Sequence, residues 1–199
     1  NVAQELKGFV PREAQAPVAV FDASSANIDA RTERGRLGGD ATGVQFALLP
    51  KPTRGNTVNV SLVLRGGTQQ TLQGQAEVVQ MMAAMLDKGT AKISRQQVSD
   101  RLDALQTQLA VGASTSEPGA LNVYLSSQRQ HVGAALQLVG TLLREPAFDP
   151  AVLQELKRQA LAQIEALRKE PEAVLDEALS RHLNPYSRGD IRHARSFDE

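Results

Sequence analysis

The sequence predicts an α+β fold, in which an antiparallel β-sheet carries helices packed on one face. Residues 57–64 alternate apolar and polar side chains, which is typical of a half-buried strand. Residues 107–127 show a strand-turn-strand pattern, and the segments between and after these stretches repeat apolar residues at helical spacing. Strand pairs that alternate with helix pairs favour this fold class over a parallel βαβ arrangement.

Composition limits the kinds of partner that the chain can have. Of its 199 residues, 41% are hydrophobic and 22% are charged, which is ordinary for a globular protein. Lys+Arg and Asp+Glu balance at 22 each, so we expect no nucleic-acid partner. The absence of cysteine excludes thiolate nucleophiles, cysteine-ligated zinc and disulfides. No apolar run reaches the length of a membrane span, so we expect no membrane-spanning segment.

The first third of the chain predicts an arm followed by a hairpin. Residues 1–34 mix Pro, Ala and polar residues without a sustained period, which predicts a linker or extended arm with short strand pieces near Val18–Phe21. The compact domain is expected to begin at residue 35. Its first strands are "GVQFALLPK" (43–51) and "TVNVSLVLRGG" (57–67), and the loop "PTRGN" between them predicts an antiparallel hairpin.

Two helices and a second hairpin are expected next. The first helix spans Gly74–Leu86 and ends at a Lys-Gly step. Ser94 is the expected N-cap of the second helix, whose apolar residues fall on one face. The stretch "TQLAVGASTSEPGALNVYLSS" (107–127) then predicts a hairpin whose strands are separated at Glu117–Gly119.

The last part of the domain is predicted to be helical. Residues 130–146 carry apolar side chains at helical spacing. A long helix or helix pair is expected to begin at Asp149-Pro150 and to run to Glu170, and Pro171 opens its continuation. The domain is therefore expected to cover residues 35–183.

No catalytic motif is visible in the residues alone. The glycine-containing stretches lack the spacing of nucleotide-binding loops, and no serine lies in a GxSxG elbow. None of the three histidines (His131, His182 and His193) has a His or Glu at the helical offset of a recognisable zinc peptidase motif, so each is interpreted as a surface or capping residue. The charges of the last helices, including Glu177 and Arg181 four residues apart, are explained by a solvated helix face.

One enzyme hypothesis rests on residues near the C-terminus. His182, Arg188 and Asp190 lie in or beside a loop that contains Pro and Gly, and they could form the site of an unrelated α+β enzyme. A polar cluster in such a loop is more often a solvated turn.

Six phrases occur in this order along the chain: "GVQFALLPK", "TVNVSLVLRGGT", "AAMLDKGT", "SRQQVSDRLDAL", "LLREPAFDP" and "LKRQALAQIEALRKEP". Together they resemble the insulinase-type (M16) zinc metallopeptidase half-repeat, over roughly residue 28 to the end. The resemblance implies a family of paired homologous α+β units that close over a chamber, in which one unit of a pair carries an inverted HxxEH zinc motif on its first helix.

The resemblance also implies which residues replace the zinc site. Alignment on "MLDKGT" puts Gln80 and Ala84 where the two His ligands would be and Ala83 where the general-base Glu would be. Alignment on the later "EP" puts Gln163 near the position of the remaining Glu ligand. Ala cannot bind zinc or take a proton, and Gln is a poor, neutral substitute. We therefore expect a unit with no catalytic residue, no bound cofactor and no metal of its own.

A substrate-contacting Arg–Tyr pair occurs in some inactive units of the family. The corresponding region of this chain offers Asn122, Tyr124, Arg129 and His131 without a clean match. That role is therefore not transferred to this sequence.

The resemblance further implies a place in a larger enzyme. Residues 1–34 resemble the end of a linker between two halves, and residues 184–199 resemble the start of a connection to a following repeat. The chain would be the third of four repeats in a large, periplasmic bacterial member. It would shape the chamber and hold a peptide substrate, while zinc belongs to the catalytic half in the same chain or a partner subunit. The alternative is a non-enzymatic interaction module on the same scaffold.

Overall fold

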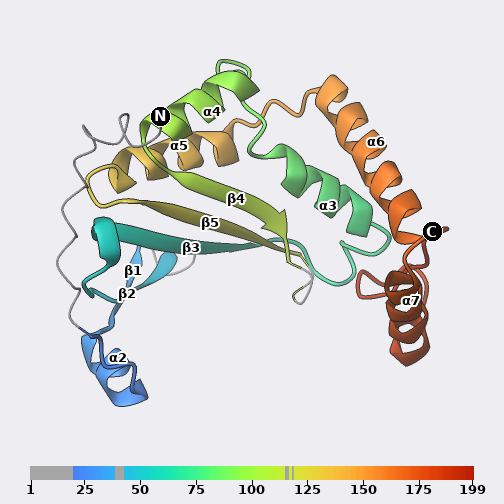
Figure 1. The fold of residues 1–199 in the computed structure, drawn as a ribbon, viewed down its shortest axis with the longest axis horizontal. Helices are drawn as coiled ribbons and strands as arrows, with labels where there is room; N and C mark the ends of the chain where they lie inside the picture. Colours follow the sequence, from blue (N-terminus) through green and yellow to red (C-terminus); the bar gives the residue numbers. More distant parts are fainter. Residues whose placement is uncertain (1–19, 39–42, 115–116, 118) are drawn as a thin grey trace, which may run out of the picture. The chain divides into compact units, whose positions relative to one another are not determined.

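The computed structural model describes residues 20–38, 43–114, 117 and 119–199. Figure 1 shows their helices and strands in chain order. Two compact units divide between Thr57 and Val58. The limits expected from the sequence, at residues 34 and 183, do not coincide with this division and stay a prediction.

The first unit contains a short helix and a two-stranded sheet. Helix α2 (Ser25–Arg31) begins after Ser24, whose hydroxyl accepts a hydrogen bond from the Asn27 amide. Strands β1 (Glu33–Leu37) and β2 (Val44–Leu48) pair antiparallel. Gly35 lies opposite Phe46, and a Cβ atom there would be 2.6 Å from the Phe46 ring. Only glycine therefore lets this ring lie across the ladder.

The sequence prediction that residues 43–51 and 57–67 pair as a hairpin is wrong. Strand β2 pairs with β1, whereas β3 (Thr57–Arg65) pairs with β5 (Ala120–Gln128). The sequence prediction missed β1 because this strand, "ERGRL", is exposed at every position and shows no apolar alternation. Helix α2 was also missed, since the linker interpretation covered the segment that contains it.

The second unit is built on a three-stranded antiparallel sheet in the order β3-β5-β4. The hairpin expected at residues 107–127 is confirmed: β4 (Gln108–Ala113) pairs with β5 in a register from Gln108–Ser126 to Ala113–Leu121. In β5, Val123, Leu125 and Ser127 are buried, while the residues between them are less buried. One face of the sheet therefore belongs to the core.

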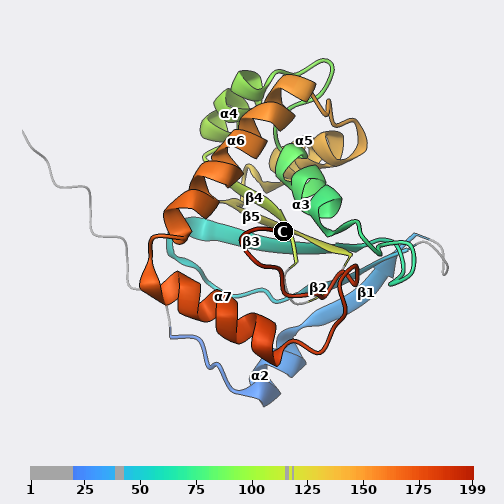
Figure 2. The ribbon, with the colours of Figure 1, turned by 90° about the vertical axis from the view of Figure 1, so that its right-hand side faces the viewer.

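Helices cover that buried face. Helices α3 (Ala76–Met85) and α4 (Arg95–Ala104) contact β4, and α5 (Val132–Arg144) contacts β5 (Figures 1 and 2). This arrangement confirms the α+β class, with an antiparallel sheet and helices on one face. Eight of the twelve buried apolar residues form two clusters that join α4, α5 and the sheet. The first contains Ile93, Val98, Leu138 and Leu142, and the second contains Val123, Leu125, Ala135 and Val139.

Two further helices follow the sheet and its covering helices. Helix α6 (Pro150–Leu167) begins at the N-cap Asp149, and α7 (Pro171–Leu183) begins with proline, as the sequence predicts. Helix α6 contacts α3, and the two lie side by side in Figures 1 and 2. Neither α6 nor α7 contains a fully buried residue.

A tight turn fixes the end of α3. The Thr90 amide donates to the Ile93 carbonyl at 2.8 Å, and the Ala147 amide donates to the Gly89 carbonyl at 3.0 Å. Gly89 has φ +117°, and a Cβ atom there would be 2.6 Å from the Ile93 oxygen. Glycine is therefore required, and the turn ties the end of α3 to the segment after α5.

Candidate functional site

Three of the four residues expected in the zinc positions lie on α3. The helix is continuous through Gln80, Ala83 and Ala84, so residues 80 and 84 are one helical turn apart on one face, as a pair of zinc-binding histidines would be. Gln80 is exposed, Ala84 is half-buried, and Ala83 is completely buried, with 0% of its surface exposed. The residue that the resemblance assigns to the general-base position is therefore part of the core.

The fourth residue, Gln163, is exposed on α6, which contacts α3. The two helices that would carry a zinc site are therefore adjacent. The side chains at the four positions do not fit zinc, since two are methyl groups and two are neutral amides. No group of three or more His, Cys, Asp or Glu residues suited to a metal ion occurs in the part of the chain that the structure describes.

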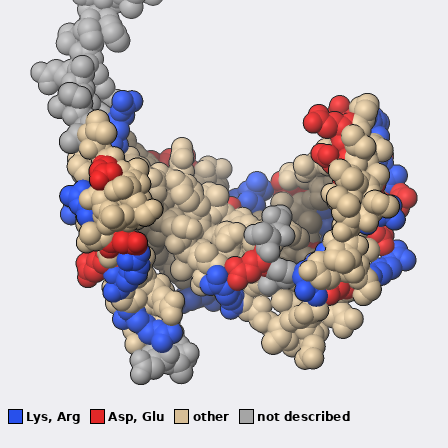
Figure 3. All heavy atoms as spheres, turned by 90° about the horizontal axis from the view of Figure 1, so that it is seen from below, with Lys and Arg blue, Asp and Glu red and all other residues tan. Residues whose placement is uncertain are grey.

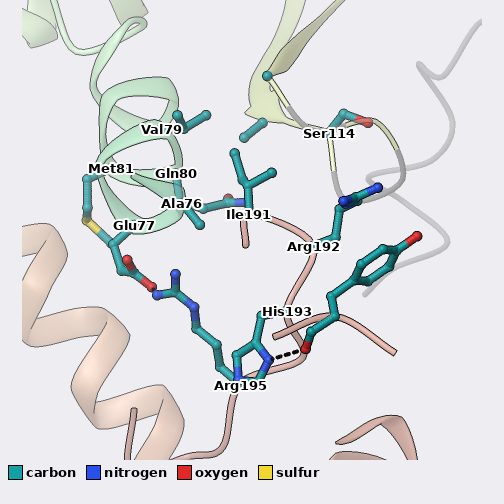
Figure 4. A pocket seen from close by; sticks show the side chains of 13 residues that line it. Ala76, Glu77, Val79, Gln80, Met81, Ser114, Ile191, Arg192, His193 and Arg195 are labelled. Atoms are coloured by element: carbon teal, nitrogen blue, oxygen red, sulfur yellow. Dashed lines mark hydrogen bonds and ion pairs between the residues drawn. The ribbon is translucent and has the colours of Figure 1, made fainter. Parts of the chain in front are cut away.

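A cavity of about 600 Å³ opens beside the start of α3 (Figure 4). Gln80 and Glu77 line it from the helix, Ser114 lies at the end of β4, and residues 191–193 and Arg195 contribute from the C-terminal segment. Ala83, Ala84 and Gln163 are not among its lining residues. Of the four residues that the resemblance assigns to the zinc positions, only Gln80 therefore lines this space.

The C-terminal wall of the cavity is held by Asp190 and Arg192. Asp190 Oδ1 accepts from the Arg192 backbone amide and from Arg192 Nε, both at 2.9 Å, and Oδ2 accepts from Nη2 at 2.7 Å. The Arg192 guanidinium also lies over the Tyr186 ring, 3.9 Å from its centroid. Hydrogen bonds from the Arg192 side chain, followed by that from its backbone amide, hold the pKa of Asp190 well below its usual range.

Two further contacts close this segment against α3 and the preceding loop. Arg195 forms an ion pair with Glu77 on the first turn of α3. The Gly74 amide donates to the Gly189 carbonyl at 2.8 Å, which joins the loop before α3 to the same segment. His193 Nδ1 lies 3.0 Å from the Tyr186 carbonyl oxygen, the contact drawn as a dashed line in Figure 4.

Sequence reasoning missed this cavity. The stretch "RGDIRHAR" (188–195) was interpreted as part of a connection, and its Arg188 and Asp190 entered only the alternative enzyme hypothesis. Its partners Gly74 and Glu77 lie more than a hundred positions earlier in the chain. The one available local signal was the Asp-x-Arg spacing of Asp190 and Arg192, which allows an acid to accept from the backbone and the side chain of the same arginine.

The residues of the alternative enzyme hypothesis do not form a site. Asp190 pairs with Arg192, whereas Arg188 Nε lies 2.7 Å from Glu199 Oε1. His182 is exposed on α7. No hydrogen bond or ion pair joins any two of His182, Arg188 and Asp190 within the described ranges.

The region of the unassigned Arg–Tyr pair lies on β5 and the turn after it. Tyr124 is 45% exposed, and its hydroxyl donates to Asn59 Oδ1 on β3 at 3.0 Å. Asn122 is exposed two residues earlier on β5. His131 precedes α5, where its Nε2 lies 2.8 Å from Gln130 Nε2. Tyr124 therefore has a structural partner on the neighbouring strand.

The surface shows no strong separation of charge on the face drawn in Figure 3, where Lys and Arg side chains are interspersed with Asp and Glu. Among the described residues, no helix combines the length and apolar composition needed to span a bilayer.

Solved structures share the fold at low sequence identity. A structure described as a peptidase M16 inactive domain from Pseudomonas fluorescens matches with a TM-score of 0.57 and 22% identity, over 70% of this chain and 33% of that one. A protease from Helicobacter pylori matches with a TM-score of 0.57 and 12% identity, over 75% of this chain and 35% of that one. A conserved protein from Enterococcus faecalis V583 matches with a TM-score of 0.52 and 14% identity, over 70% of this chain and 36% of that one. The matched region thus spans about a third of each of these proteins.

Sequence comparison identifies the family. A search of curated proteins gives no match. The profile described as "Insulinase (Peptidase family M16)" matches residues 47–187, which extend from β2 to just beyond α7 and include residues 80, 83, 84 and 163. The chain therefore belongs to the insulinase family, peptidase family M16.

Proposed function

We propose that this chain is a non-catalytic domain of an M16-type zinc metallopeptidase. It contributes part of the wall of a closed chamber and helps to hold a peptide substrate, while zinc and the activation of water belong to the catalytic half. The observation that carries this proposal is a family match over residues 47–187 in which the four residues that the resemblance assigns to the zinc site are Gln80, Ala83, Ala84 and Gln163.

The chemistry of these positions favours binding over bond breaking. Methyl groups at residues 83 and 84 cannot take a proton or donate an electron pair to a metal. The Gln80 amide both donates and accepts hydrogen bonds, as a peptide backbone does, and it faces a cavity of about 600 Å³. This combination suits a surface that holds an extended peptide without hydrolysing it.

The proposal places the catalytic half either in the same polypeptide or in a partner subunit. The neighbouring structures are about three times as long as the region that matches. Further units in the intact enzyme are consistent with that length. The proposal includes a periplasmic location, which fractionation of cells that produce the native protein tests directly.

Zinc analysis and peptide cleavage test the proposal together. The purified chain should contain far less than one zinc per molecule, and it should not cleave a fluorogenic peptide library. A Gln80→His/Ala84→His/Gln163→Glu variant should gain zinc binding, because the helical spacing and the contact between α3 and α6 remain in place. A Gln96→His/Asp100→His variant of α4 is the matched control, since it has two exposed histidines four residues apart without the third ligand.

The outcomes separate the alternatives. Stoichiometric zinc in the unmodified chain, accompanied by peptide cleavage, would contradict a non-catalytic role. Stimulation of peptide cleavage when the chain is added to an M16 half that carries HxxEH supports the proposed role. A chain that leaves such a half unaffected and binds no peptide would instead favour an interaction module on the same scaffold.

A further inference from the structure

The cavity beside the start of α3 has a largely apolar wall. Val79 and Met81 line it from α3, Ala113 lines it from the end of β4, and Ile191 lines it from the C-terminal segment. Its volume of about 600 Å³ falls within the range of ligand pockets in proteins. Apolar side chains around a cavity favour an apolar occupant, because the contact removes both surfaces from water.

The charged side chains of this wall are already paired within the chain. Glu77 and Arg195 extend toward each other from α3 and the C-terminal segment and form an ion pair (Figure 4). Arg192 pairs with Asp190, which is not among the lining residues. His193 Nδ1 lies 3.0 Å from a backbone carbonyl oxygen. A charged ligand would therefore leave water for a wall that offers it no free counter-charge.

One neutral hydrogen-bonding group of the wall remains available. Gln80 lines the cavity from an exposed position of α3, and its side chain has no hydrogen-bond partner among the described residues. A glutamine amide offers an acceptor oxygen and two N–H donors, which match the N–H and C=O groups of a peptide backbone. The wall thus combines apolar contact with one group that suits a peptide bond.

We propose that this cavity receives an uncharged, apolar side chain of an extended peptide, such as that of leucine, while the Gln80 amide bonds to the peptide group beside it. This inference rests on the proposed peptide-holding role and deepens it by naming the class of side chain that is bound. The Glu77–Arg195 ion pair determines the specificity, because each charge cancels the other and neither is offered to the ligand.

All three methionines of the chain lie on α3, and their methyl groups report on the cavity in nuclear magnetic resonance spectra. Met81 lines the cavity, whereas Met82 and Met85 are not among its lining residues, and Met85 is only 5% exposed. The capped peptide acetyl-Gly-Leu-Gly-amide should therefore shift the methyl resonance of Met81, with a dissociation constant on the order of 1 mM because one side chain buries little surface. The resonances of Met82 and Met85 should move much less.

Peptides that differ only in the charge of the central residue test the specificity. The side chains of Glu77 and Arg195 are 56% and 28% exposed, so water screens their pair and the discrimination should be modest. The peptides with Glu or Lys in place of Leu should bind about tenfold more weakly than the Leu peptide, because each buries a charge without a partner. These two charged peptides should bind about equally.

Breaking the ion pair should change this preference in opposite directions. Glu77→Gln leaves Arg195 without its partner, so the Glu peptide should bind more tightly than the Lys peptide. Arg195→Gln leaves Glu77 without its partner and should reverse that order. The double variant should again bind the two charged peptides equally. The matched control is Glu155→Gln on α6, where the acid pairs with Arg95 and does not line the cavity, so the order of the three peptides should be unchanged.

Filling the cavity tests its occupancy directly. Ala76 lines the cavity at the start of α3 and is half-buried, so Ala76→Leu should occupy part of the space and weaken binding of the Leu peptide about tenfold. Val78 is 59% exposed on the same helix and is not a lining residue, so Val78→Leu should leave binding unchanged. Circular dichroism and an unshifted Met85 resonance verify that each variant is folded.

The outcomes separate this inference from the proposed function, because the backbone amide resonances of the whole chain report binding at any position. Peptides that shift other resonances but not that of Met81 would leave the peptide-holding role intact and overturn the cavity as its site. Glu or Lys peptides that bind the unmodified chain as tightly as the Leu peptide would overturn the preference for an uncharged side chain. A chain whose resonances respond to none of the peptides would contradict both the cavity and the peptide-holding role.

Discussion

A carboxyl group at residue 83, the position that the resemblance assigns to the general base, should remove much of the stability of the domain. Ala83 is completely buried on α3, in a helix whose neighbouring residues Met85 and Leu86 are also buried. A carboxyl group with an ordinary pKa of about 4.3 must be protonated to remain buried at pH 7, which costs about 2.7 × 1.36, or roughly 3.7 kcal/mol. The larger side chain adds about 1–3 kcal/mol of overpacking.

The total of roughly 5–7 kcal/mol is comparable with the whole stability of a typical domain, about 5–15 kcal/mol. Urea unfolding followed by circular dichroism measures the free energy of unfolding of Ala83→Glu against the unmodified chain. Because burial raises the pKa of the introduced carboxyl, the folded state binds its proton more tightly than the unfolded state does. The destabilisation should therefore shrink by about 1.4 kcal/mol for each unit that the pH falls below 7, until the pH approaches about 4.3.

Two variants isolate the charge contribution. Ala83→Gln has nearly the same shape without an ionisable group. It should therefore show the losses from overpacking and from burying a neutral polar group, and no pH dependence beyond that of the parent. Gln80→Glu, at an exposed position of the same helix, should change the free energy of unfolding little. Equal stabilities of Ala83→Glu and Ala83→Gln at pH 7 would refute the reasoning, since the site would then be accessible to water.

Three other expectations concern the scaffold. Ser94→Ala removes a capping box in which Ser94 and Gln97 satisfy each other's backbone amides, and it should cost about 1 kcal/mol in urea unfolding; an unchanged midpoint would contradict this. Leu142→Ala, at a residue only 2% exposed, should cost about 2–5 kcal/mol and lower the thermal midpoint, and a loss below that range would indicate that the core closes around the cavity. Hydrogen bonds, first of all those from the Arg192 side chain, lower the pKa of Asp190 in the folded state. The ionised carboxylate therefore stabilises the fold when the pH is above the ordinary pKa of 3.8. This stabilisation decreases progressively as the pH falls below 3.8. The stability difference between the unmodified chain and Asp190→Asn should therefore narrow in acid, and a difference that is constant between neutral and acidic pH would argue against that pairing.

Local signals were sufficient to predict the elements of the second unit. Ser94 predicts the start of α4 because its side chain satisfies a backbone amide that the helix leaves free. The Asp149-Pro150 pair predicts the start of α6 because the Asp149 side chain likewise caps a free backbone amide and proline suits the first helical position. In β5, the alternation of apolar and polar residues predicts which face of the strand is buried. The pairing of β2 was predicted wrongly because its partner β1 is exposed along its length, and the choice of strand partner depends on contacts that no local window contains.

The candidate site, too, was predicted only in part from the sequence. Positions 80, 83, 84 and 163 were found from the resemblance, which fixes their order along the chain. The burial of Ala83 and the exposure of Gln80 could not be derived from it, because both depend on what packs around α3. The cavity wall formed by Arg192 and Arg195 depends on contacts with residues far earlier in the sequence, for which the sequence offers no periodic signal.

The turn at Gly89 holds the end of α3 through backbone hydrogen bonds. Zinc ligands commonly perform two tasks, since they bind the ion and tie together the elements that carry them. In this chain, backbone hydrogen bonds of Gly89 and Thr90 to Ala147 and Ile93 contribute to the second task without a metal ligand. We expect such a scaffold to tolerate changes at residues 80 and 84, because these hydrogen bonds keep the helix in position whatever side chains it carries. The same tolerance makes α3 a suitable place to graft new metal sites.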